Sequence, residues 1–252
     1  MGLYIEARIR ADLDSLWTLT QEPAQHQRWD LRFTEIDYLP RAEGEPQHFR
    51  YATRVLPFLT VAGTGVSAGE KERPDGTRTS ALRFASPHPL SLLAEGSGYW
   101  RYVPTADGIR FLTGYDYRPR WGRFGRAVDR FGFRPLMGWA TAWSFDRLRL
   151  WLERGITPER ARLYWLAEMG ARAVTVVAAC TGLGLRRFIE LAEPAMAPLV
   201  CLLPLLCVIA VPLAFFAPPL PCTPAARRCL RTAPARTRAP RLAATLELRE
   251  QS

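Results

Sequence analysis

The stretch 195–217, AMAPLVCLLPLLCVIAVPLAFFA, contains no charged residue. As a helix, which rises about 1.5 Å per residue, it would extend about 34 Å, enough to cross a hydrocarbon core of about 30 Å. Pro198, Pro204 and Pro212 weaken a helix, but membrane helices tolerate proline better than soluble helices do. A buried helix of a larger domain is the alternative. The length of the stretch and the arginine-rich sequence after it favour a membrane span.

A second apolar stretch, AVTVVAACTGLGL at 173–185, would extend only about 20 Å as a helix. Extending it back to Leu163 brings in Glu168 and Arg172, which are four residues apart and can neutralise each other on one helix face. We therefore predict a helical membrane region at 156–217. Its spans are predicted at about 165–187 and 195–217.

The charges flanking these stretches predict a topology. The tail after Ala217 carries seven arginines and two glutamates, and the positive-inside rule places it in the cytoplasm. The opening segment 1–10 has no apolar core, so we expect no signal peptide to export the N-terminal part. Two spans leave both ends cytoplasmic, whereas one span would not. We therefore expect a membrane hairpin in the cell membrane, with a cytoplasmic N-terminal domain and a disordered cytoplasmic tail at 218–252.

The N-terminal part begins with a strand and a helix. Apolar and polar residues alternate in LYIEARI at 3–9, which predicts a half-buried strand. Asp12 is a suitable N-cap for a following helix, and Pro23 ends or interrupts that helix. A short second helix fits residues 24–29.

Six further strands are predicted between residues 33 and 118. The segments 74–76 (Pro-Asp-Gly) and 107–108 (Asp-Gly) are turn signals between them. Glycines at 63, 65 and 69 are typical of bends in a strongly curved sheet. The predicted strands are 33–39, 47–55, 60–73, 77–85, 92–103 and 109–118.

A long helical pattern follows from Trp121 to Trp151, with apolar residues mostly three to five positions apart. Pro135 should kink or split it, and Gly155 is a candidate C-cap. A block of strands with helices at both ends predicts an α+β domain with an antiparallel sheet. A curved sheet around one long helix leaves room for an apolar cavity.

The order of these elements resembles the helix-grip fold of the SRPBCC superfamily, which includes START, Bet v 1-like and polyketide cyclase/dehydrase-like proteins. Four features carry the resemblance: the opening strand into ADLDSLWTLT, the stretch HQRWD at 26–30, the strand pair SGYWRYVPTADGIRFLTGYDY, and the long helix that ends the domain. The resemblance covers residues 1–155 and implies a hydrophobic ligand cavity. It implies no universal catalytic motif, so it transfers no catalytic residue to this chain.

Aromatic residues are the candidates to line this cavity. On the strand 109–118, period-two alternation places Phe111, Thr113, Tyr115 and Tyr117 on one face. A tyrosine inside a cavity can orient the polar end of an apolar ligand. An ordinary aromatic core is the alternative for these positions. The candidates are Trp29, Phe84, Trp100, Tyr102, Phe111, Thr113, Tyr115, Tyr117 and Trp139.

The stretch 118–134, RPRWGRFGRAVDRFGFR, has six arginines and four aromatic residues. This combination is typical of nucleic-acid-binding surfaces and of amphipathic segments at a membrane. A solvated helix start whose aromatic rings pack on the sheet is the third interpretation. The net charge of +10 attracts phosphate groups, and the apolar stretches favour lipid over nucleic acid. The candidates for membrane contact are Arg120, Trp121, Arg123, Phe124 and Arg126.

Signals for catalysis and metal binding are weak. The three histidines, His26, His48 and His88, form no metal-ligand spacing, and a nucleophile motif such as G-x-S-x-G is absent. We therefore assign no catalytic residue and expect no metal and no cofactor.

Three functions remain open from the sequence. The leading one is a non-enzymatic binding protein that holds a hydrophobic small molecule or lipid beside the membrane. The second is a cyclase or dehydratase acting on polyketide-like substrates, which requires two or more polar side chains converging inside the cavity. The third is a structural or regulatory membrane protein with a closed core.

Overall fold

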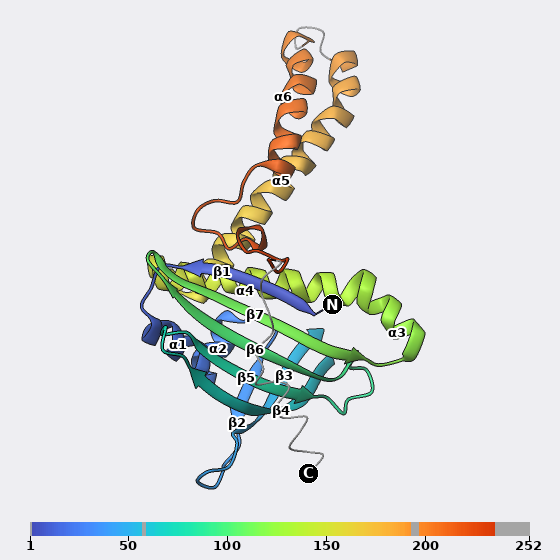
Figure 1. Ribbon diagram of the computed structural model, residues 1–252. Coiled ribbons are helices and arrows are strands. Elements are labelled where there is room, and N and C mark those ends of the chain that lie inside the picture. The colour runs from blue at the N-terminus through green and yellow to red at the C-terminus, as the bar shows by residue number, and fades with distance from the viewer. Residues whose placement is uncertain (1, 57–58, 193–196, 235–252) are drawn as a thin grey trace. The chain divides into compact units, whose positions relative to one another are not determined.

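The computed structural model describes residues 2–56, 59–192 and 197–234, and side chains for 2–54, 59–184 and 204–234 (Figure 1). The chain divides into two compact units. Unit 1 comprises Met1–Pro158 and Ala225–Ser252, and unit 2 comprises Glu159–Pro224.

Unit 1 is built on one curved antiparallel sheet of seven strands in the order β1-β7-β6-β5-β4-β3-β2. Each predicted strand is present, with ends shifted by a few residues, because alternation and turn residues both point to the same segments. The bounds are β1 Leu3–Ile9, β2 Glu35–Tyr38, β3 His48–Leu56, β4 Leu59–Glu72, β5 Arg78–Ala85, β6 Leu93–Thr105 and β7 Gly108–Pro119.

Two short helices, α1 (Leu13–Gln21) and α2 (Pro23–Trp29), connect β1 to β2. The Asp12 side chain accepts a hydrogen bond from the backbone N–H of Ser15 at 2.7 Å, which confirms the predicted N-cap. The Trp29 indole donates to the carbonyl of Leu19 at 2.8 Å, so its ring is held beneath the end of α1.

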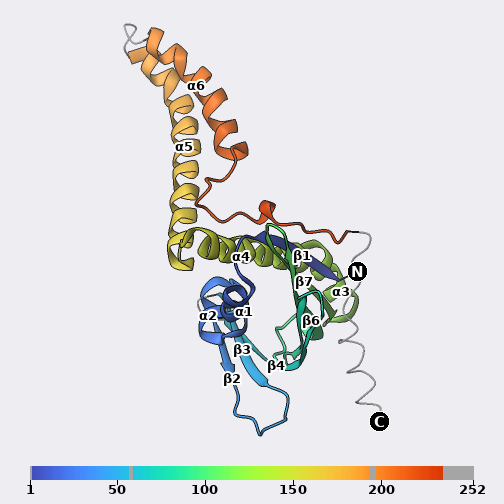
Figure 2. The same ribbon diagram turned by 60° about the vertical axis from the view of Figure 1, so that its left-hand side comes forward.

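The long helical pattern forms three consecutive segments: α3 (Gly122–Val128), a π-helical turn η1 (Asp129–Phe133) and α4 (Arg134–Arg154). The π turn ends two residues before Pro135, whose missing N–H and ring disturb regular α-helical bonding to the preceding turn. α4 crosses the concave side of the sheet (Figures 1 and 2). Gly155 ends it with φ 62°, as the sequence predicts.

An aromatic core joins α4 to the sheet. The rings of Phe111 on β7 and Phe145 on α4 stack with centroids 4.4 Å apart, and both side chains are fully buried. Trp29 and Trp100 pack around the same pair, with ring centroids 6.2 Å from Phe145 and 5.9 Å from Phe111, respectively. This cluster closes one part of the space between helix and sheet.

Residues 225–231, which we call the strap, pack back onto unit 1. The backbones of Glu6 and Leu230 exchange two hydrogen bonds of 2.9 Å, which extends the sheet beyond β1 (Figure 2). The sequence predicts that only one face of the strand 3–9 is buried, but Tyr4 and Glu6 on its other face are buried as well. The strap explains this difference. It also differs from the expected disordered tail; residues 235–252 lie outside the described residues.

Unit 2 is a hairpin of two helices, α5 (Pro158–Ala192) and α6 (Ala197–Phe216), which lie side by side in both views (Figures 1 and 2). Glu168 and Arg172 form the predicted ion pair at 2.6 Å, and Arg172 also donates to the Ala214 carbonyl at 2.8 Å. By length and composition, one helix within the described residues, Pro158–Gly184, is long and apolar enough to cross a membrane. The predicted second span includes 195–196, which lie outside the described residues.

Candidate functional site

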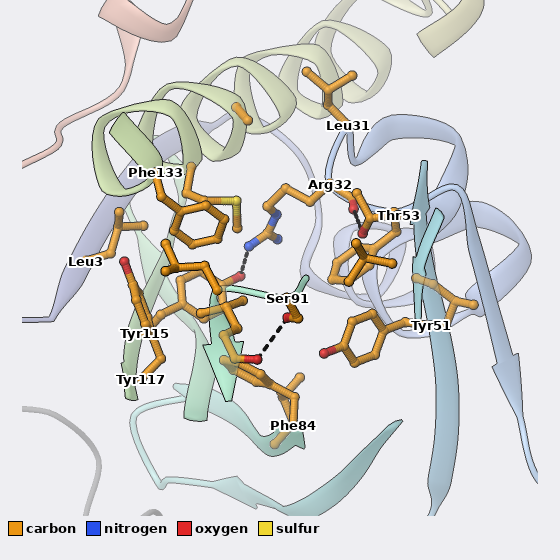
Figure 3. Close-up of a pocket in the computed structure, with 18 of the residues that line it drawn as sticks. Leu3, Leu31, Arg32, Tyr51, Thr53, Phe84, Ser91, Tyr115, Tyr117 and Phe133 are labelled. Atoms are coloured by element: carbon orange, nitrogen blue, oxygen red, sulfur yellow. Dashed lines mark hydrogen bonds between the residues drawn. The ribbon is translucent and has the colours of Figure 1, made fainter. Parts of the chain in front are cut away.

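Unit 1 contains a cavity of about 620 Å³, open to solvent on one side, between the concave face of the sheet and the helices α2 and α4 (Figure 3). Ligand sites for small molecules typically occupy about 300–1,000 Å³ and are mostly apolar. Its lining is dominated by aliphatic and aromatic side chains, from Leu3 on β1 to Met137 and Ala140 on α4.

The structure separates the predicted cavity residues into two groups. Phe84, Trp100, Tyr115, Tyr117 and Trp139 line the cavity. The other four, which are completely or almost completely buried and lie outside its lining, are Trp29, Tyr102, Phe111 and Thr113. Alternation along a strand identifies the face of the sheet, but the position where α4 packs directly on that face decides which residues become core.

A buried ion pair contributes polar groups to the cavity wall, and the sequence prediction missed it. Arg32 follows α2 and donates to the Asp30 carboxylate through Nε at 2.9 Å and Nη2 at 2.6 Å. Its Nη1 donates to the hydroxyl of Tyr115 (Figure 3). Both charged side chains are nearly inaccessible to solvent. No periodic pattern marks Arg32, because it lies in a loop between α2 and β2.

The charges of this pair balance each other. Burial opposes ionisation of Asp30, but the charge and hydrogen bonds of Arg32 outweigh it and hold the pKa of Asp30 below its usual value. The carboxylate therefore stays ionised and neutralises the guanidinium. The cavity wall here offers hydrogen-bonding groups without a net charge.

His26 also lines the cavity and was not predicted as a site residue. Its Nε2 lies 3.0 Å from Oδ2 of Asp30, and its ring packs among Trp29, Phe33 and Trp100. Burial lowers the pKa of His26, and the neighbouring Asp30 only partly offsets this. A neutral imidazole at this position can orient the carboxylate or exchange a proton with a bound molecule.

The four tyrosines lining the cavity differ in what their hydroxyls bind. Tyr38 donates to the carbonyl of Gln21 at 2.7 Å, Tyr117 donates to Asp129, and Tyr115 accepts from Arg32. For Tyr51, no hydrogen bond to its hydroxyl is formed by any residue that the structure describes. Tyr51 points from β3 toward the cavity interior (Figure 3).

The predicted membrane-contact residues lie where β7 leads into α3. The Arg120 guanidinium turns inward and donates to the carbonyls of Ser86 at 2.6 Å and His88 at 3.2 Å, so it holds the loop after β5. The Trp121 indole donates to the Pro89 carbonyl and also lines the cavity. Arg123, Phe124 and Arg126 are exposed. The exposed large apolar side chains of this region are Leu90, Trp121, Phe124, Phe131 and Leu136.

Comparison with known proteins identifies one curated relative from Bacillus subtilis (strain 168), described as "Uncharacterized membrane protein YndG". It is 50% identical over 159 residues, which are 63% of this chain and 59% of that protein. The chain therefore spans less than two thirds of the relative's length. No protein-family model matches the chain.

Among solved structures, a STAR-related lipid transfer protein from Xanthomonas axonopodis is 18% identical, with a TM-score of 0.44 over 59% of this chain and 84% of that one. The Zhui aromatase/cyclase from Streptomyces sp. R1128 is 15% identical, with a TM-score of 0.40 over 59% and 96% of the two chains. The fold assignment rests on the topology described above, in which a seven-stranded curved antiparallel sheet holds one long helix. Unit 1 of this chain therefore has a helix-grip fold, in which the curved sheet holds the long helix α4.

Proposed function

We propose that this chain is a membrane-tethered binding protein that holds a hydrophobic small molecule or lipid in the cavity of unit 1. The single observation that carries the proposal is the apolar-lined cavity of about 620 Å³. At about 30 Å³ for each water-sized group, this volume accommodates a ligand of roughly 20 non-hydrogen atoms. An apolar cavity of this size also argues against a closed, ligand-free core.

Blocking the cavity should abolish ligand retention. Val61 lines the cavity from β4, and its neighbour Ala62 is exposed on the opposite face of the same strand. We expect Val61→Trp to fill part of the cavity and to reduce bound ligand at least tenfold. Native mass spectrometry of the full chain, purified in detergent from cells that express it, measures the bound fraction.

Ala62→Trp is the matched control, because it adds the same ring to the same strand outside the cavity. It should retain ligand at the level of the unmodified protein. Equal ligand retention by both variants, or recovery of no small molecule from any preparation, would count against the binding proposal.

The membrane part of the proposal rests on unit 2 and on the named relative, which is described as a membrane protein. Many apolar side chains on α5 and α6 are exposed, including Val174, Val177, Val208 and Phe216. Such a surface is stable in lipid but costly in water. At its start, the hairpin carries the Glu168–Arg172 pair, in which two charges compensate each other.

The strap supports a two-span topology. The chain leaves unit 1 after Pro158 and returns to it at Ala225, where the backbone N–H donates to Asp146 of α4 at 2.8 Å. Both ends of unit 2 are therefore joined to one folded unit, which lies on one side of the membrane. An inserted segment with both ends on one side must cross an even number of times, so we propose a hairpin with unit 1 in the cytoplasm.

Reporter fusions test this topology. Alkaline phosphatase, which is active only outside the cytoplasm, should be active when inserted at Glu190 and inactive when fused after Ser252. Green fluorescent protein should give the opposite result at the two positions. A cytoplasmic signal at Glu190 would overturn the hairpin.

A further inference from the structure

We propose that Tyr51 binds the polar end of the ligand, and that this end is an uncharged hydrogen-bond acceptor such as a ketone, ester or alcohol oxygen. This inference rests on the binding function proposed above and specifies the ligand class. It follows from three observations about the cavity: the free hydroxyl, the balanced charges and the space made for the Tyr51 ring.

Tyr51 is the cavity tyrosine whose hydroxyl is still available. Within the described part of the chain, the hydroxyls of Tyr38, Tyr115 and Tyr117 all bind protein groups, whereas that of Tyr51 binds none. Burial raises the pKa of Tyr51 to about 12, so the phenol keeps its proton and can donate it in a hydrogen bond. A donor directed into an apolar cavity is satisfied by an acceptor on the ligand.

The ring of Tyr51 occupies space that the opposite strand leaves free. Tyr51 pairs with Gly63 across β3 and β4, and a Cβ atom at Gly63 would collide with the Tyr51 ring, with its hydroxyl and with the backbone carbonyl of Ala85. Phe49 lies over Gly65 in the same way, two residues along the strands. The glycines therefore allow both rings to lie across β4, with the Tyr51 hydroxyl directed into the cavity (Figure 3).

The cavity interior does not suit a charged end. Arg32 uses Nε and Nη2 for Asp30 and Nη1 for Tyr115, so its charge is already balanced within the wall. Arg54, the other arginine of the lining, is exposed to solvent at the rim. A carboxylate near Tyr51 would be buried without a countercharge of its own, which is costly. An uncharged acceptor carries no such cost.

A competition between three ligands of equal carbon number tests the inference. The full chain in detergent is incubated with methyl tetradecyl ketone, hexadecane and hexadecanoate, and native mass spectrometry measures the occupancy of each. We expect the ketone to be bound most. In Tyr51→Phe, the ratio of bound ketone to bound hexadecane should fall about fivefold, the effect of one neutral hydrogen bond.

One further variant completes the test. Tyr99→Phe, the matched control, removes the hydroxyl of a β6 tyrosine that does not line the cavity, so the ratio should stay unchanged. An unchanged ratio in Tyr51→Phe would overturn the role of Tyr51, and preferential binding of hexadecanoate would overturn the uncharged class. If none of the three ligands binds the unmodified protein, the binding function itself fails.

Discussion

Replacing Arg32 with methionine is expected to lower the free energy of unfolding of unit 1 by about 3–5 kcal/mol. The change leaves the Asp30 carboxylate, which is inaccessible to solvent, without its guanidinium partner. It also removes the donor to Tyr115 in the cavity wall. Urea unfolding of the full chain in detergent, followed by tryptophan fluorescence, measures the loss, because Trp29 and Trp100 pack against His26, which contacts Asp30.

The double variant Asp30→Asn/Arg32→Met should recover more than half of that loss, because the uncompensated charge is gone. Arg118→Met is the control for arginine removal: its pair with Glu95 is largely exposed, so the unfolding midpoint should not change. A cost for Arg32→Met no larger than for Arg118→Met would show that the pair does not hold the loop after α2 to the sheet.

The second large effect is expected at Asp146, the buried carboxylate of α4. It accepts hydrogen bonds from Arg149 at 2.7 Å, from Arg228 at 2.8 Å and from the backbone of Ala225 at 2.8 Å. Asp146→Ala leaves two arginines and one N–H without this acceptor and should cost about 3 kcal/mol of unfolding free energy. The same change should release the strap from α4.

Limited trypsin digestion detects that release, because cleavage after Arg227 and Arg228 requires the strap to leave unit 1. We expect Asp146→Ala to be cut at least tenfold faster there. Asp14→Ala, which removes an exposed aspartate paired with Arg78, should be cut at the original rate. Equal cleavage rates for both variants would mean that Asp146 does not hold the strap.

The secondary structure of unit 1 could be predicted from the sequence because its signals are local. Asp12 caps α1 through a residue three positions away, and Gly155 ends α4 through its own backbone angle. The strands follow from alternation and from turns such as Asp107-Gly108, which joins β6 to β7. Their order was enough to indicate the helix-grip arrangement.

The cavity could be predicted only in part. Alternation placed Phe111 and Tyr115 on the same face of β7, yet Phe111 stacks on Phe145 in the core and Tyr115 lines the cavity. The difference depends on where α4 contacts the sheet, which no repeat in the sequence encodes. Arg32 was missed for a related reason. Its partner Tyr115 lies 83 positions away along the chain, so no local pattern could reveal the contact.

The sequence alone determined the elements of this protein, its apolar hairpin segment and its basic, arginine-rich character, because each depends on residues within a few positions of one another. Only the tertiary structure decided which cavity tyrosine binds no other described residue through its hydroxyl, and that residues 225–231 belong to unit 1. Those outcomes depend on contacts such as Ala225 with Asp146, 79 residues apart. Such contacts form when the sheet and α4 have packed, and their geometry is a property of the packed chain.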